Sequence, residues 1–140
     1  MKHEQKPNAF TIPVRVYYED TDAAGVVYYA NYLKFFERCR TEWMRQIGHD
    51  QSALLQAHGI AFVVRSASVE YLKPARLDDA LTIGLEVEKL GRARVVFRQH
   101  VRRGDEELAT GVVQVVCVEM AKMKSTPIPE FLHPQLEALS

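Results

Sequence analysis

Three carboxylates stand within four residues near the start of the chain, in the stretch EDTDAAG at residues 19–25. Carboxylates at this spacing bind metal ions, cap turns and helices, or act as nucleophiles and general bases. Gly25 closes the stretch, and an aromatic-rich segment with helical periodicity follows within a few residues. The rest of the chain must decide which of these roles Glu19, Asp20 and Asp22 serve.

Metal binding finds little support in the pattern. An EF-hand loop starting at Asp20 would need a bidentate glutamate at its twelfth position, which is Asn31, and an oxygen ligand at its fifth, which is Ala24. A magnesium site for phosphoryl transfer would need a parallel α/β sheet, which the strand-rich second half of the chain excludes. Zinc is disfavoured because the five histidines are scattered and no Cys or His pair has ligand spacing. A capping role and an acid, base or nucleophilic role both remain open.

Apolar periodicity predicts the elements that position the acidic stretch. Residues 10–18 alternate as a strand does, and a long helix is predicted from about residue 28 until Gly48 ends it. A short helix is predicted over residues 50–59. The long helix would carry one apolar stripe, formed by Tyr32, Phe35, Phe36, Cys39, Trp43 and Ile47.

The second half of the chain is predicted to form four strands, over residues 60–72, 80–90, 92–102 and 107–120. A tail with several prolines and a short terminal helix follows them. Short connections predict that successive strands pair in antiparallel fashion. The fold class expected for residues 1–140, taken as a single domain, is therefore α+β, with a curved antiparallel sheet around one long helix. In the strand over residues 80–90, alternation places Leu81, Ile83, Leu85 and Val87 on one face and Thr82, Glu86 and Glu88 on the other.

Composition excludes several classes of function. Lys+Arg and Asp+Glu both number 18, a balance that argues against a dedicated nucleic-acid binder. The N-terminus lacks the apolar core of a signal peptide, and the apolar run that starts at Val112 is too short to span a bilayer. Cys39 and Cys117 are expected to be buried free thiols, so we expect a soluble cytoplasmic protein without membrane insertion.

Three segments resemble the hot-dog-fold acyl-CoA thioesterases of the 4-hydroxybenzoyl-CoA thioesterase family, and most closely the YbgC-like branch associated with the Tol-Pal system. The segments are VRVYYEDTDAAGVVYYANYLKFFERCRTE at 14–42, FVVRSASVEYLKPARLDD at 62–79 and VVCVEMAKMKSTPIP at 115–129. The resemblance implies hydrolysis of acyl-CoA, with a short-chain or aromatic acyl group, to the free acid and CoA without a cofactor. It also implies a homodimer or homotetramer with sites between subunits, and names acyl-carrier protein as a further partner.

The resemblance also assigns residues. The catalytic carboxylate would be Asp22, acting as nucleophile or general base. From their positions in the stretch, we expect Asp20 and Glu19 to shape the loop and hold it against the helix. Gly25 would let the backbone turn into the helix, where the backbone N–H of Tyr29 would polarise the thioester carbonyl. Tyr29 stands where many members of the branch have a histidine, which leaves the N–H role intact because every residue except proline has that group.

Arg92 and Arg94 are the residues expected to bind the phosphates of coenzyme A, and the alternative is that they form a solvated strand end. Lys73 and Arg76 are weaker candidates. A rival interpretation is a non-catalytic hot-dog domain that binds acyl-CoA or acyl-carrier protein, which the intact Asp22 argues against. A hydratase or dehydratase of the same fold would need a histidine beside a carboxylate, and the acidic loop contains none.

Overall fold

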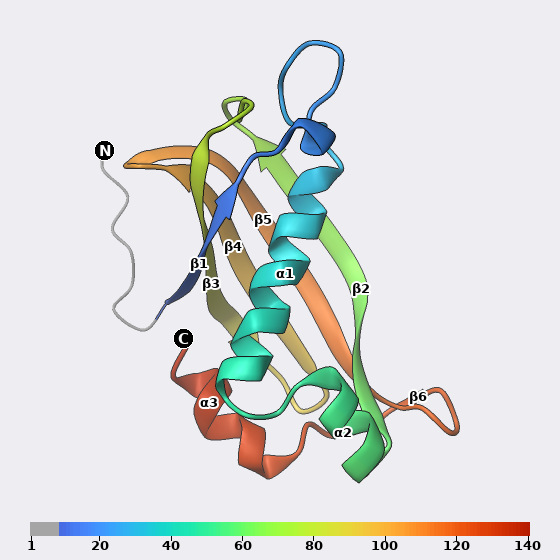
Figure 1. Cartoon of the computed structure of the whole chain (residues 1–140). Coiled ribbons are helices and arrows are strands. Elements are labelled where there is room, and N and C mark those ends of the chain that lie inside the picture. Colours follow the sequence, from blue (N-terminus) through green and yellow to red (C-terminus); the bar gives the residue numbers. More distant parts are fainter. Residues whose placement is uncertain (1–8) are drawn as a thin grey trace.

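The computed structural model describes residues 9–140, which form a six-stranded antiparallel sheet curled around helix α1 (Figure 1). The strands are β1 (Phe10–Arg15), β2 (Ile60–Tyr71), β3 (Ala80–Leu90), β4 (Arg94–Arg103), β5 (Glu106–Glu119) and β6 (Lys124–Ser125), in the order β1-β3-β4-β5-β2 with β6 paired to β5. The helices are α1 (Asn31–Gln46), α2 (Gln51–His58) and α3 (His133–Glu137), with 3-10 turns η1 (Tyr18–Asp20) and η2 (Glu130–Leu132). The predicted α+β class is confirmed.

The apolar stripe of α1 forms the core, as its spacing predicts. All of its members are buried except Ile47, which is partly buried. Gly111 in β5 lies directly beneath Phe36, and a side chain at that position would collide with the phenyl ring. The helix begins at Asn31 rather than at residue 28, because residues 28–30 form the turn that leads into it.

The four residues predicted to share the apolar face of β3 are all buried, at most 2% exposed. On the opposite face Glu86 is also buried, beside His100 on β4, with Oε1 and Nε2 3.8 Å apart. His100 also contacts Glu107 through its Nδ1 atom. Burial lowers the pKa of His100, and the hydrogen bond to Glu107 opposes this effect. Polar groups are thus buried on the opposite face of β3 and β4 as well.

The prediction that successive strands pair is wrong for β2 and β3. The connection between them, residues 72–79, crosses the ends of β5 and β4, and β3 pairs with β1 and β4 instead. The N–H groups of Leu72 and Lys73 donate to the carbonyl of Leu108 at the start of β5, which ties the connection to the sheet. An eight-residue chain can span about 25 Å, enough to cover the three interstrand spacings of ~4.8 Å that separate β2 from β3. The curl of the sheet leaves β2 as an edge strand.

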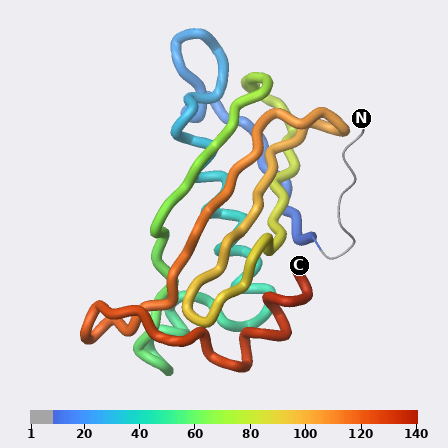
Figure 2. The backbone as a smooth tube through the Cα atoms, turned by 180° about the vertical axis from the view of Figure 1, so that it is seen from behind, coloured from blue at the N-terminus to red at the C-terminus, as the bar shows by residue number. Residues whose placement is uncertain are grey.

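The loops and short helices gather at the two ends of the sheet. The loop over residues 21–30, the β2–β3 connection and the β4–β5 hairpin gather at one end, which we call the loop end (Figure 1). Helices α2 and α3, the β3–β4 turn and the β5–β6 hairpin gather at the other, the turn end (Figure 2). None of the helices in residues 9–140 combines the length and apolarity that a membrane span needs.

Candidate active site

The acidic stretch folds as a small closed loop between η1 and α1. The N–H of Asp22 donates to the carbonyl of Val26 at 2.9 Å, and the N–H of Gly25 donates back to the carbonyl of Asp22 at 3.0 Å. Gly25 has a φ of +77°, in the left-handed region that glycine enters without a steric penalty. Val26 forms an antiparallel bridge with Arg76, so the loop is fastened to the β2–β3 connection.

Asp20 is the buried carboxylate of the stretch. Its Oδ2 atom accepts a hydrogen bond from the N–H of Tyr17 at 2.9 Å. Its main-chain carbonyl accepts two more, from the N–H of Tyr28 at 3.0 Å and from Nδ2 of Asn31 at 2.9 Å. Asp20 therefore joins the segment that follows β1, the loop and the first residue of α1.

Asp22 is the exposed carboxylate. Its Oδ1 atom accepts the N–H of Ala24 at 2.9 Å, a local turn, and no other hydrogen bond or ion pair of its side chain lies within residues 9–140. One carboxylate oxygen is thus left facing solvent. Glu19 is also exposed, and within the same residues its side chain has no such contact, so the expectation that Glu19 holds the loop finds no support.

The entry to α1 offers hydrogen-bond donors. The N–H groups of Asn31, Tyr32 and Leu33 donate three residues back, at 2.9, 3.4 and 3.2 Å. None of the hydrogen bonds between described residues is donated by the N–H of Tyr29 or Ala30. A helix N-terminus carries a partial positive charge, so these two groups are placed to receive an oxygen that gains negative charge.

Tyrosines surround these donors. The hydroxyl of Tyr71 on β2 donates to the carbonyl of Tyr29 at 2.9 Å, and the ring of Tyr29 lies 4.8 Å from that of Tyr28 and 6.2 Å from that of Tyr71. Burial raises the pKa of Tyr71, and the neighbouring Tyr32 and Tyr29 add to the effect. Sequence reasoning missed Tyr71, because nothing in the local pattern links it to a residue 42 positions earlier.

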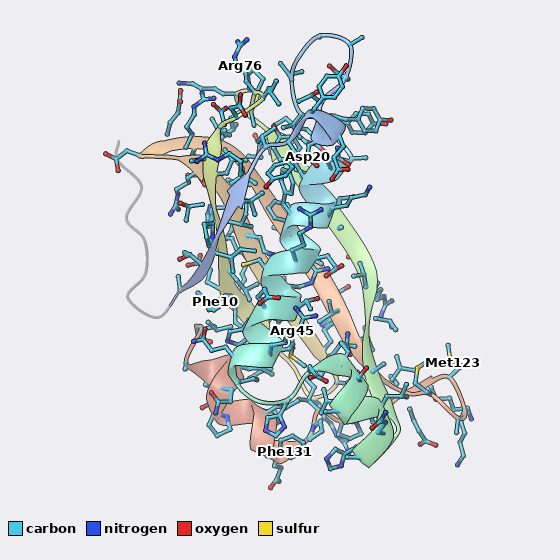
Figure 3. All side chains as sticks on the ribbon, viewed as in Figure 1. Phe10, Asp20, Arg45, Arg76, Met123 and Phe131 are labelled. Carbon is cyan, nitrogen blue, oxygen red and sulfur yellow. The ribbon has the colours of Figure 1, made fainter. Side chains whose placement is uncertain are left out.

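The candidate phosphate ligands divide between the two ends of the molecule. Arg92 and Arg94 lie at the β3–β4 turn, at the turn end, and are exposed without an ion pair among the described residues. A single chain therefore does not bring them to Asp22, since the ~24 Å length of α1 separates the ends. Arg76 lies at the loop end with Asp20 (Figure 3), and Lys73 is paired with Glu106 at 2.8 Å.

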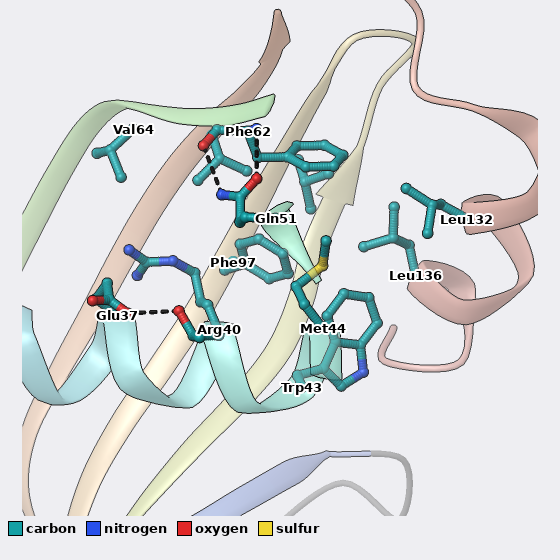
Figure 4. Close-up of a pocket in the computed structure, with 13 residues that line it drawn as sticks. Glu37, Arg40, Trp43, Met44, Gln51, Phe62, Val64, Phe97, Leu132 and Leu136 are labelled. Atoms are coloured by element: carbon teal, nitrogen blue, oxygen red, sulfur yellow. Dashed lines mark hydrogen bonds between the residues drawn. The ribbon is translucent and has the colours of Figure 1, made fainter. Parts of the chain in front are cut away.

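A cavity of about 150 Å³ lies between α1, β2, the central strands and the C-terminal helices (Figure 4). Its apolar wall includes Trp43, Met44, Phe62, Phe97, Leu132 and Leu136, and its polar residues are Glu37, Arg40, Thr41 and Gln51. Within the described part of the chain, no three side chains of the metal-binding types cluster closely enough to hold an ion.

The thioesterase superfamily model matches residues 24–110. Acyl-CoA thioesterase YbgC of Haemophilus influenzae is 46% identical over 88% of this chain and 90% of its own length. Acyl-CoA thioester hydrolase YbgC of Escherichia coli is 48% identical over 86% of this chain and 90% of its own. The crystal structure of a probable thioesterase from Bartonella henselae has a TM-score of 0.82 at 34% identity, covering 86% of this chain and 99% of that one.

The curled sheet around one helix, the family match over more than half of the chain and the similarity to the two YbgC proteins agree with one another. The chain therefore belongs to the thioesterase superfamily, as a hot-dog thioester hydrolase of its YbgC-like branch.

Proposed function

We propose that this chain hydrolyses acyl-CoA to a carboxylic acid and coenzyme A, with Asp22 as the reacting carboxylate. One observation carries the proposal: a solvent-facing carboxylate and the N–H groups of Tyr29 and Ala30, which donate no hydrogen bond within residues 9–140, flank the same short loop at a helix entry. The names of the two YbgC relatives support acyl-CoA as the class of substrate.

In the proposed reaction the thioester carbonyl oxygen accepts the N–H of Tyr29, which stabilises the negative charge that develops on that oxygen. Asp22 then attacks the carbonyl carbon and forms an anhydride that water opens, or it removes a proton from the attacking water. In both routes the C–S bond breaks and coenzyme A leaves as its thiol or thiolate. The Tyr71 hydroxyl, which donates a hydrogen bond to the carbonyl of Tyr29, would hold the turn before α1 in place.

Arg92 and Arg94 enter the proposal through a second copy of the chain. β2 is an edge strand, and residues 63–68 are exposed along it, so its outward N–H and C=O groups are available for pairing. Antiparallel pairing of two β2 edges about a two-fold axis would set the loop end of one copy beside the turn end of the other. The two arginines of the partner copy would then face the phosphates of a coenzyme A bound at Asp22. Each dimer would have two sites, alone or within a dimer of dimers.

Replacement of Asp22 by asparagine tests the chemical role. Asp22→Asn keeps the acceptor for the Ala24 N–H but removes both the nucleophile and the base, so kcat should fall at least ~10²-fold while acyl-CoA still binds. Asp20→Asn, which keeps an acceptor for Tyr17, is the matched control and should cost much less. Thiol release measures turnover. Near-normal turnover by Asp22→Asn would mean that this carboxylate only closes the loop.

The rival role of a non-catalytic acyl-CoA or acyl-carrier-protein binding domain has no specific feature in its favour, because the loop retains a carboxylate free to react. Acyl-carrier protein as a partner stays a prediction from the resemblance. A purified chain that binds acyl-CoA at micromolar concentration and releases no thiol would support the rival.

A further inference from the structure

The cavity beneath α1 has a size suited to a small hydrocarbon group. Its volume is about 150 Å³, and an apolar cavity of this volume holds one benzene ring. Figure 4 shows Trp43, Met44, Leu132 and Leu136 around one part of the cavity, and the side chain of Arg40 extending from α1 towards β2 in another.

The guanidinium of Arg40 is held in the cavity wall by a hydrogen bond to the side-chain amide of Gln99. Its Nη1 atom donates to Oε1 of Gln99 at 2.8 Å. Gln99 is fully buried, and its Nε2 atom donates to the carbonyl of Phe36 at 3.0 Å, so the amide cannot turn over without losing a bond. An arginine has five N–H donors, and Gln99 is the one acceptor of Arg40 among the residues that the structure describes. Donors of Arg40 therefore remain for a group that enters the cavity.

The charge of Arg40 is compensated only at a distance. No carboxylate of residues 9–140 lies within ion-pair distance of it, whereas Arg45 is paired with Glu42 and Arg103 with Asp79. Glu37, one turn earlier on α1, accepts the Thr41 hydroxyl at 2.6 Å instead. Burial lowers the pKa of Arg40, and the charge of Glu37 opposes that effect.

We propose that the cavity receives the acyl group of the substrate, and that Arg40 donates a hydrogen bond to a neutral oxygen, a hydroxyl or keto group, on that acyl chain. The apolar wall accounts for the hydrocarbon part, and the fixed guanidinium accounts for the oxygen. A carboxylate is disfavoured because Glu37, which also lines the cavity, would repel a second anion in this partly desolvated space. The inference rests on the proposed function and makes Arg40 its specificity-determining residue.

Substrate pairs that differ by one oxygen test the inference. We expect at least one of the 3-, 4- and 5-hydroxyhexanoyl-CoA esters to exceed hexanoyl-CoA in kcat/KM by about tenfold, as expected for a hydrogen bond to a charged donor. In Arg40→Met this ratio should fall towards one, and Arg40→Lys should keep part of it. Arg45→Met, on the exposed side of the same helix, is the control and should keep the wild-type ratio.

Three outcomes would overturn the inference. No hydroxylated ester has a higher kcat/KM than hexanoyl-CoA, the ratio of the two kcat/KM values is unchanged in Arg40→Met, or Arg40→Met lowers kcat/KM equally for all substrates. A higher kcat/KM for glutaryl-CoA than for the hydroxyhexanoyl-CoA esters would also overturn it, because the recognised group would then be an anion.

Fluorescence gives a readout that is independent of hydrolysis. Trp43 is the single tryptophan of the chain and lines the cavity, so its emission should report occupancy. Titration with hexanamide and the three hydroxyhexanamides should show tighter binding of at least one hydroxylated amide, and this gain should be lost in Arg40→Met. Such binding without any thioester hydrolysis would refute the proposed function alone. Hydrolysis with Trp43 emission unchanged by every ligand would refute the cavity assignment alone.

Discussion

The side-chain amide of Asn31, the first residue of α1, donates to the main-chain carbonyl of Asp20, with 2.9 Å between nitrogen and oxygen. The N–H of Tyr28 donates to the same carbonyl at 3.0 Å. The two bonds close the loop whose tip carries Asp22. The position of Asp22 relative to the helix entry is therefore set by these two bonds, together with the main-chain hydrogen bonds of Asp22 to Val26 and Gly25.

Asn31→Ala should loosen this loop. Loss of one partly buried hydrogen bond should lower the free energy of unfolding by about 1 kcal/mol. We also expect kcat/KM to fall about tenfold, because catalysis depends on the placement of the carboxylate. Gln46→Ala, at the exposed C-terminal end of the same helix, is the control. Thermal unfolding and thiol release give the two readouts, and a loss of stability without loss of activity would contradict the positioning role.

The two thiols predict how stability varies at high pH. Burial raises the pKa of Cys39 to about 12 and that of Cys117 to about 11, from a value of 9.0 for an exposed thiol. The unfolded chain therefore loses these protons first as pH rises above 9, and the folded state is progressively destabilised up to about pH 12. Below pH 9 the contribution is constant. Denaturant unfolding between pH 7 and 10.5 measures it, and Cys39→Ala with Cys117→Ala should flatten the decline.

The sequence predicts what depends on local periodicity. The stripe of α1 and the bounds of β3 follow from spacings of 3.6 and two residues, and both are confirmed. The placement of β2 does not follow, because connection length says how far a chain can reach and not how a sheet curls. The bonds of Tyr71 to Tyr29 and of Arg40 to Gln99 join residues 42 and 59 positions apart. Such contacts exist only once the sheet has closed around the helix, so local patterns contain no signal for them.

The proposed dimer predicts that a proline on the outer edge of β2 separates the subunits. The Cys117 N–H donates to Ala93, so alternate residues of β5, including Val112 and Gln114, face β2 and pair with Ser68 and Ser66. Ala67 lies between these two and directs its N–H outwards. Ala67→Pro should therefore leave the β2–β5 ladder intact while removing a donor from the edge. Ala67→Val keeps the donor and is the control.

Light scattering at micromolar concentration, with thiol release on the same samples, measures the outcome for Ala67→Pro. We expect a folded protein of lower mass with most of its activity lost. A wild-type chain that is monomeric and fully active would refute the assembly, as would an Ala67→Pro protein that remains dimeric through the same edge.

The arginines at the β3–β4 turn should act on binding rather than on chemistry. Both side chains are exposed at the turn end, so replacing Arg92 and Arg94 with alanine should leave the fold intact. The loss of phosphate contacts should raise KM for acyl-CoA with kcat nearly unchanged, which is the signature of lost uniform binding. A truncated thioester without the nucleotide should be hydrolysed as by the wild type. Equal losses with both substrates would mean that the arginines have a structural role.

Mixing of subunits decides which copy supplies the arginines. If they serve the Asp22 of the partner, a heterodimer of Asp22→Asn and the Arg92→Ala, Arg94→Ala double variant has one intact site and one site that lacks both functions. Random exchange makes half of the dimers mixed, so about a quarter of all sites should be intact, and kcat/KM at low acyl-CoA concentration should approach that fraction of the wild-type value. If the arginines serve Asp22 of their own chain, no mixed dimer contains an intact site. The mixture would then show only the activity averaged from the two parents, and the antiparallel arrangement of the β2 edges would be wrong.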